Sequence, residues 1–241
     1  MGSQPSRVRV LWSIAFRIST SFGLCLPSER VSKDNSAPME AFHTDSISES
    51  DFTLILSILR HGGVIGFPTD TAAIDRIFNI KGRAETKPIL LLVDSIRMVE
   101  SISDPNQMFY SVASRFWPGP LSLVVKAQPS IPARVTAGTN TIGLRWPVAP
   151  FAVKLMGKLG KPITATSANL SDRPAAVSAG EVQSQLGESL DVLIDGGLLP
   201  ARSGSSVLDL TIDPPVLLRE GPISFESLQE FFKGRIRRPP A

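Results

Sequence analysis

The sequence predicts an α/β domain built on a mixed β-sheet. Short apolar runs of strand length alternate with segments in which apolar residues recur at helical spacing. Gly and Pro separate the two kinds of segment. Several strand-like runs are joined by loops too short for the crossover helix that parallel strands need, so the sheet must also contain antiparallel pairs.

The regular pattern begins with a helix over residues 52–59, where apolar residues recur at helical spacing before the terminator Gly62-Gly63. The apolar run 64–67 then predicts a buried strand that ends at Pro68, and residues 72–80 predict a second helix. Further buried strands follow along the chain. We expect them at residues 88–93, 121–125, 141–146, 163–166, 192–194, 206–210 and 216–219.

Helical segments separate most of these strands. We expect them at residues 105–117, 149–159, 178–186 and 224–232. The segment Phe116-Trp117-Pro118-Gly119-Pro120 joins a helix to a strand, and we assign it a packing role in that turn. Neither an internal repeat nor a break in composition follows Met39, so one domain is the simplest interpretation.

Composition limits the chemistry open to this chain. Its 241 residues suffice for one sizeable core, and no apolar run approaches the roughly 20 residues of a membrane span. The single cysteine, Cys25, excludes an intramolecular disulfide and a cysteine-based zinc site. Two histidines make a histidine-rich metal site or a Ser-His-Asp triad a poor fit. Chemistry must therefore rest on Lys, Arg, Ser, Thr, Asn and carboxylates, and we expect no metal site built from protein ligands.

Residues 1–38 differ from the rest in being rich in Ser and Arg, and their five bases and two acids account for the whole net charge of +3. This composition fits an organellar transit peptide, a disordered extension, or translated sequence upstream of a start at Met39. We therefore expect an N-terminal extension (1–38), one domain (39–232) and a basic tail (233–241). The expected location is cytoplasmic, with no membrane contact and with organellar targeting as the alternative.

Two short polar segments indicate a site for a phosphate-bearing ligand. Lys81-Gly82-Arg83 places two cations just after the helix expected at 72–80, and Thr166-Ser167-Ala168-Asn169 ends the strand expected at 163–166. Cations, hydroxyls and amides held at the ends of strands or helices bind phosphate well. The sequence contains neither a Walker A loop nor a GxGxxG after a strand, so another device must hold any nucleotide.

Three more polar positions follow predicted strands. Pro68-Thr69-Asp70-Thr71 fits either the N-cap of the next helix or a ligand contact. Arg145 ends an apolar strand whose packing does not require an arginine, which favours a ligand contact. Arg219 ends the last predicted strand and fits either an edge residue or a ligand contact.

Taken in order, these segments resemble the YrdC/Sua5 family, the L-threonylcarbamoyladenylate synthases. The resemblance covers about residues 50–224 and matches a short, YrdC-type chain. The segments that carry it are Pro68-Thr69-Asp70-Thr71, Lys81-Gly82-Arg83, Lys87-Pro88, 116–120, 141–147, 163–169, Asp195-Gly196-Gly197, 204–209 and 218–221.

The resemblance implies a twisted α/β sheet with a concave basic cavity, in which L-threonine, bicarbonate and ATP form threonylcarbamoyl-AMP and pyrophosphate. It implies Mg²⁺ held mainly by the ATP phosphates, and threonylcarbamoyl-transferase partner proteins that modify adenosine 37 of tRNA. The residues that would form the catalytic tetrad are Lys81, Arg83, Ser167 and Asn169. Threonine would be bound by Thr69, Arg145, Ser167 and Ser205. ATP would be bound by Lys81, Arg83, Thr141, Asn169 and Arg219.

The sequence departs from the family pattern between Thr71 and Lys81. The family continues with Val-Tyr-Gly-Leu and about ten more residues, whereas Thr71 is followed directly by Ala72, so about eleven cavity-lining residues are missing. This shortening supports an alternative hypothesis, a non-catalytic YrdC-like module that binds nucleotide, tRNA or double-stranded RNA, with the basic tail contributing to RNA binding. A third hypothesis, carbamoyl transfer as in hydrogenase maturation, lacks the zinc-finger and acylphosphatase modules of those proteins.

Overall fold

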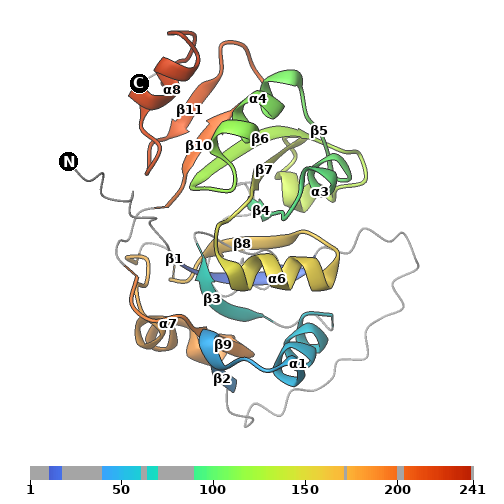
Figure 1. Ribbon diagram of the computed structural model, residues 1–241, viewed down its shortest axis with the longest axis vertical. Coiled ribbons are helices and arrows are strands. Elements are labelled where there is room, and N and C mark those ends of the chain that lie inside the picture. The colour runs from blue at the N-terminus through green and yellow to red at the C-terminus, as the bar shows by residue number, and fades with distance from the viewer. Residues whose placement is uncertain are drawn as a thin grey trace, which may run out of the picture.

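The computed structural model describes residues 11–17, 40–60, 64–69, 90–170, 173–199 and 204–239. Eleven strands within these residues form one mixed sheet, and helices lie against it (Figure 1). The predicted α/β fold with a mixed sheet is confirmed. In the same part of the chain, no helix is long and apolar enough to cross a membrane. The helix expected at 72–80 and the segment Lys81-Gly82-Arg83 lie outside the described residues.

Ten strands follow one another across the sheet. Their order is β11 (Val216–Arg219), β10 (Ser206–Asp209), β6 (Leu121–Ala127), β7 (Thr141–Arg145), β4 (Leu90–Leu92), β8 (Ile163–Ser167), β1 (Leu11–Arg17), β3 (Ile65–Thr69), β9 (Val192–Asp195) and β2 (Glu40–His43). The short strand β5 (Ser103–Asp104) pairs with β6. The pairs β10/β6, β7/β4, β3/β9 and β9/β2 are parallel, and the other pairs are antiparallel.

One face of the sheet, here called the α4 face, carries the largest core. The helices that contribute to this core are α3 (Ile96–Glu100), α4 (Gln107–Phe116), α5 (Ala133–Thr136) and α8 (Phe225–Phe231). Phe109 of α4 and Leu228 of α8 are buried together with Leu123, Leu144 and Leu208 of the strands beneath them. The strands β6, β7 and β10 are therefore closed to solvent on this face.

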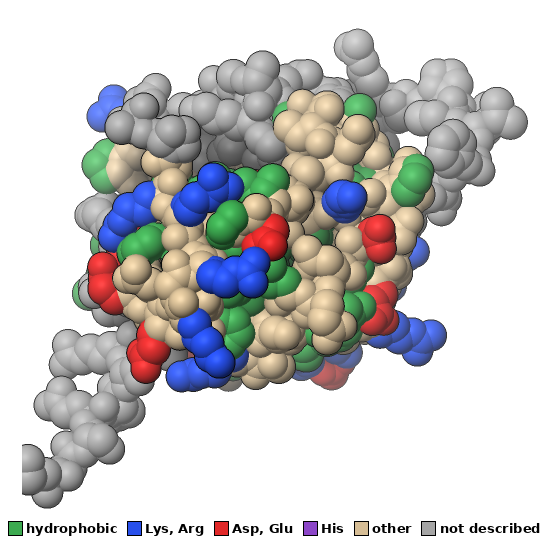
Figure 2. Space-filling view, turned by 90° about the horizontal axis from the view of Figure 1, so that it is seen from above, with side chains coloured by type: hydrophobic (Ala, Val, Ile, Leu, Met, Phe, Trp, Pro, Cys, Tyr) green, Lys and Arg blue, Asp and Glu red, His purple; other side chains and the backbone are tan. Residues whose placement is uncertain are grey.

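The residues expected to form a basic tail pack against β11, the strand at one edge of the sheet. Ile236 is buried in the same core, and the backbone of Arg237 exchanges hydrogen bonds of 2.9 Å with Leu217 and Pro215. Arg235 and Arg238 each form an ion pair with an acidic side chain. Figure 2 looks down on this end of the molecule and shows Lys and Arg side chains interspersed with acidic and apolar ones. Residues 233–239 are thus continuous with the domain.

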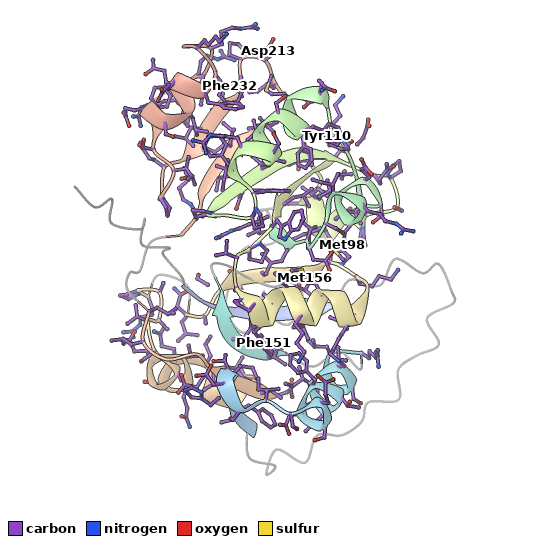
Figure 3. All side chains as sticks on the ribbon, in the orientation of Figure 1. Met98, Tyr110, Phe151, Met156, Asp213 and Phe232 are labelled. Atoms are coloured by element: carbon purple, nitrogen blue, oxygen red, sulfur yellow. The ribbon has the colours of Figure 1, made fainter. Side chains whose placement is uncertain are left out.

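The opposite face, here called the α6 face, is covered over β3, β8 and β9 by two helices. They are α1 (Glu49–Arg60) and α6 (Pro150–Leu159). The Phe151 ring lies on the α1 side of α6 (Figure 3), and its centroid is 5.4 Å from those of both Phe52 and Phe67. On the α4 face of the same strands, α7 (Ala179–Leu186) covers Leu193 and Val64. The sheet is therefore buried on both faces here.

Two features of the strands β1 and β3 differ from the sequence prediction. The first is β1, which lies within the segment expected to be an N-terminal extension and yet pairs with both β3 and β8. The second is that β3 continues through Pro68 to Thr69. A proline is tolerated there because β3 pairs with β9 only at Ile65 and Gly66, so beyond Gly66 one edge of β3 needs no ladder donor.

The packing of α1 yields a prediction within one helix. Leu59 is 1% exposed and lies in the core under α6, whereas Leu54 is 38% exposed. Leu59→Ala should lower the free energy of unfolding by about 2–5 kcal/mol, because it opens a cavity in that core. Leu54→Ala, the matched control, should change it by less than about 0.5 kcal/mol. Urea unfolding followed by circular dichroism measures both, and equal effects would contradict the packing of α1 described here.

Candidate active site

The predicted site residues of β7 lie on the α6 face, in the half of the sheet away from α1. Ile142 and Leu144 are buried in the core on the α4 face. Because side chains alternate along a strand, Thr141 and Arg145 lie on the opposite face. The same alternation in β6 places Ser122 on the α6 face, beside Leu123 in the core.

A bulge in β11 brings Arg219 to this face. Leu217 pairs with Leu208 in the core, and Arg219 pairs with Val207, so Leu218 is the extra residue. Without the bulge Arg219 would lie on the same face as Leu217, two residues before it. Instead it shares the α6 face with Val207, whose partner in β6 is Ser122.

Ser205 holds the Arg219 guanidinium, and a second buried serine, Ser122, bonds to Ser205. Its Nε donates to the carbonyl oxygen of Ser205 at 2.9 Å, and its Nη2 donates to Ser205 Oγ at 3.2 Å. Ser205 Oγ lies 2.8 Å from Ser122 Oγ in a second hydrogen bond. Ser122 and Ser205 are only 1% and 2% exposed, so these bonds form in a poorly solvated place where they orient side chains strongly.

Two glycines allow the backbone to close around this guanidinium. A Cβ at Gly204 would lie 2.9 Å from Nη2 of Arg219, and a Cβ at Gly221 would lie 2.6 Å from the carbonyl oxygen of Gly204. A larger residue at Gly221 would force two backbone segments apart, whereas one at Gly204 would displace the Arg219 guanidinium. The close approach of the backbones therefore depends on Gly221, and the position of the guanidinium depends on Gly204.

Arg145 is a cation in the protein interior. Its side chain is fully buried, and its Nε donates to the carbonyl oxygen of Gly119 at 3.0 Å. Burial, and then the positive charge of Arg219, hold the pKa of Arg145 well below its usual range. An anion bound beside Arg145 and Arg219 would favour the charged form of both guanidinium groups.

The polar segment Thr166-Ser167-Ala168-Asn169 begins with the last two residues of β8. Ile163 and Ala165 lie in the core under α6, so Ser167, at the end of the same alternation, falls on the α6 face. Asn169 is 8% exposed, and its Nδ2 donates to the carbonyl oxygens of Leu170 and Arg173 at 2.9 and 2.5 Å. Its amide nitrogen thus holds the turn that follows the strand.

The remaining predicted site residues are more widely spread. Thr141 begins β7 and Arg145 ends it, so the two lie roughly 13 Å apart along the strand. Thr69 ends β3, opposite Leu11 of β1. The structure therefore brings Arg145, Ser205 and Arg219 together. It places Thr69, Thr141 and Ser167 at strand ends and Asn169 in the turn after β8, while Lys81 and Arg83 lie outside the described residues.

Sequence reasoning missed Ser122. A serine interrupts the apolar run 121–125 at a position that alternation places away from the core, and this is the signal that would have found it. The bulge at Leu218 leaves no such signal in the sequence, because its neighbours are ordinary strand residues.

Comparison with known proteins identifies the family of the chain. The family model Sua5_yciO_yrdC, described as "Telomere recombination", matches residues 57–221. The chain belongs to the Sua5/YciO/YrdC family. The resemblance stated from the ordered motifs is thereby confirmed.

Individual members of the Sua5/YciO/YrdC family are similar over most of this chain. It is 34% identical over 209 residues to the threonylcarbamoyl-AMP synthase of Pyrococcus abyssi, which covers 82% of this chain and 61% of that protein. It is 34% identical over 185 residues to a putative threonylcarbamoyl-AMP synthase of Mycobacterium tuberculosis, covering 71% of this chain and 84% of that protein. The chain thus spans about three fifths of the Pyrococcus protein.

A solved structure shares the fold. The crystal structure of P. abyssi Sua5 complexed with L-threonine matches with a TM-score of 0.77 at 33% identity, and covers 85% of this chain and 63% of that chain. The mixed α/β sheet is therefore the fold of this family.

The serine pair yields a prediction about coupling. Ser122→Ala and Ser205→Ala should each lower the free energy of unfolding by about 1–2 kcal/mol, because each leaves a buried hydroxyl without one partner. The double variant should cost about 1 kcal/mol less than the sum of the two. Ser114→Ala, at an exposed serine of α4, is the matched control and should change it by less than about 0.5 kcal/mol. Strict additivity in urea unfolding would contradict the Ser122–Ser205 contact.

Proposed function

We propose that this chain is a threonylcarbamoyl-AMP synthase, which joins L-threonine, bicarbonate and ATP into threonylcarbamoyl-AMP and releases pyrophosphate. The observation that carries the proposal is the pair of neighbouring cations, Arg145 and Arg219, fixed on one face of the sheet by Gly119 and Ser205. Two relatives named for this activity are each 34% identical to the chain. A site with two such cations suits two anionic substrates.

Threonine binding requires a cation for its carboxylate and hydroxyls for its polar groups. Arg145 suits the carboxylate, since a guanidinium can donate two parallel hydrogen bonds to it. Ser205 lies at the Arg219 end of the same face, and we assign it to threonine together with Ser167 and Thr69. The related Sua5 structure from P. abyssi is complexed with L-threonine, which supports this choice of substrate.

The nucleotide is assigned to Arg219, Thr141, Asn169, Lys81 and Arg83. In the proposed reaction the threonine amine forms a carbamate with bicarbonate, with loss of water. A carbamate oxygen then attacks the α-phosphate of ATP, the bond to the bridging oxygen breaks, and pyrophosphate leaves. Negative charge grows on phosphate oxygens in this step, and fixed cations stabilise it electrostatically. Lys81 and Arg83 with Ser167 and Asn169 would form the catalytic tetrad.

The side chains assigned to this site suit an Mg²⁺ ion that is already bound to the ATP phosphates. In the described residues no group of three or more His, Cys, Asp or Glu side chains is placed to hold a metal ion. Mg²⁺ bound mainly by ATP phosphates needs few protein ligands, and it would neutralise phosphate charge. The protein residues then bind and orient the substrates.

The product determines the partners. Threonylcarbamoyl-AMP is a mixed anhydride that water destroys, so it must pass to a transferase that acts on tRNA. We therefore propose threonylcarbamoyl-transferase proteins and tRNA as partners, and a cytoplasmic location. The RNA-binding alternative gains no support from residues 233–239, because Arg235 and Arg238 are ion-paired and Ile236 is buried.

The direct test is pyrophosphate release by the purified full-length chain. Release should require ATP, threonine and bicarbonate together. Protein that is folded by circular dichroism but releases no pyrophosphate would overturn the proposal.

Within the active enzyme, Arg219→Gln should lower kcat/KM roughly 100-fold, because it removes a fixed charge beside the nucleotide. Arg238→Gln, the same substitution at an exposed ion-paired residue, should leave it within about twofold.

Arg145→Gln should weaken threonine binding while it changes the free energy of unfolding little. The glutamine retains a donor toward Gly119 but removes the buried charge. Folding lowers the pKa of Arg145, so the charged side chain lowers the free energy of unfolding at every pH below the pKa that it has in the folded protein. Replacing it by a neutral glutamine relieves this cost. We expect the KM for threonine to rise more than about 10-fold while the free energy of unfolding falls by less than about 1 kcal/mol. A large loss of stability with an unchanged KM would assign Arg145 a purely structural role.

A further inference from the structure

We propose that residues 11–17 are a permanent strand of the domain, and that this strand sets the spacing between the strand ends at Thr69 and Ser167. The claim about the fold stands without the proposed function, and its consequence for catalysis rests on that function.

The backbone of β1 is paired along both edges. Residues 11–15 pair antiparallel with β3, and residues 13–17 pair antiparallel with β8. Ser13, Ile14 and Ala15 therefore have partners on both sides. Among the described strands, β1 is the one that joins β3 to β8, and two strand spacings of roughly 4.8 Å separate those neighbours.

The two neighbours of β1 lie deep in the protein. Ile65 and Phe67 of β3 and Thr164 of β8 are fully buried, and Ala165 is 2% exposed. Helices α1 and α6 cover one face of this region and α7 packs on the other side of β3 and β9. Without β1, the inner edges of β3 and β8 would carry unpaired backbone donors and acceptors, and each one that stayed shielded from water by the covering helices would cost about 1–3 kcal/mol. A strand in this position is therefore a requirement of the fold.

The strand also aligns two predicted site residues. Ser13 lies opposite Phe67 on one side and opposite Ser167 on the other, and Leu11 lies opposite Thr69. If β3 and β8 instead paired directly, Thr69 and Ser167 would approach each other by one strand spacing, roughly 4.8 Å. A displacement of about 1 Å in a catalytic site can already cost roughly 100-fold in rate. β1 thus acts as a positioning element.

The presence of β1 in the sheet bears on whether residues 1–38 are removed as a transit peptide, lie upstream of a start at Met39, or are retained. A transit peptide removed on import, or sequence upstream of a start at Met39, would leave the sheet without β1. A retained segment keeps the strand. We therefore infer that residues 11–17 remain in the working protein.

Hydrogen exchange on the full-length wild-type chain gives the first test. Amides of residues 12–16 should exchange as slowly as those of β3 and β8, because all three strands open together. Exchange of residues 12–16 within seconds, with β3 and β8 protected, would overturn the proposal. This measurement needs neither a variant nor turnover.

A matched pair of variants at Ile14 gives the second test. Ile14 lies opposite Gly66 and Thr166, so Ile14→Pro removes a donor from a strand paired on both sides. We expect exchange of the β3 and β8 amides to accelerate roughly 100-fold, with little change in β10 and β11 at the far end of the sheet. Ile14→Val keeps the donor and should change exchange by less than about threefold. Equal behaviour of the two variants would overturn the proposal, and if Ile14→Pro is insoluble the wild-type measurement decides.

A chain that begins at Met39 links the inference to activity. It should lose the protection of β3 and β8 and should release pyrophosphate at least about 100-fold more slowly than the full chain. Wild-type exchange and wild-type turnover in the shortened chain would overturn the inference. A full chain with protected β1 amides but no turnover would instead refute only the proposed function.

Discussion

The continuity of the sheet depends on the pairing of β1 along both of its edges. On one side of it stand β3, β9 and β2 with α1 and α7, and on the other side stand β8, β4 and the strands that carry the cations. Helix α6 shares one core with strands of both groups, and its Phe151 contacts Phe67 of β3. Side-chain packing is tolerant of small shifts, whereas a hydrogen-bonded ladder fixes register residue by residue. The relative placement of the two groups of strands therefore follows from seven backbone residues near the N-terminus.

A second constraint is the cost of holding Arg145 inside the protein. A buried guanidinium beside a second cation lowers stability unless an anion is present, and the depressed pKa of Arg145 expresses that cost. The fold offsets it locally with the carbonyl oxygen of Gly119, which accepts a hydrogen bond from Arg145, while the carbonyl oxygen of Ser205 accepts one from Arg219. It also commits two glycines and a bulge to place Arg219. Packing alone does not explain this arrangement, and under the proposed function it serves to bind anionic substrates.

The parts of this fold that are visible in the sequence are those set by local periodicity. Helix α4 and strands β6, β7 and β8 appear close to their predicted bounds, because their apolar residues face cores formed over the whole element. Strand β1 was missed because its stability comes from β3 and β8, which lie about 50 and 150 residues away in the chain. Arg145 was found as a charge in an apolar strand, whereas the orientation of Arg219 depends on a bulge that no residue type signals. The roles of Lys81 and Arg83 stay predictions.

The two groups of candidate site residues depend on different parts of the sheet. Arg145, Ser205 and Arg219 lie on β7, at the start of β10 and on β11, whose mutual spacing is set by β6 and by the Ser122–Ser205 contact. The distance from Thr69 to Ser167 depends on β1 instead. Damage to β1 should therefore leave anion binding by the two arginines largely intact while it disrupts the geometry between Thr69 and Ser167. Binding without turnover would be the signature of such damage, and it would arise from strand spacing rather than from any change in the cations themselves.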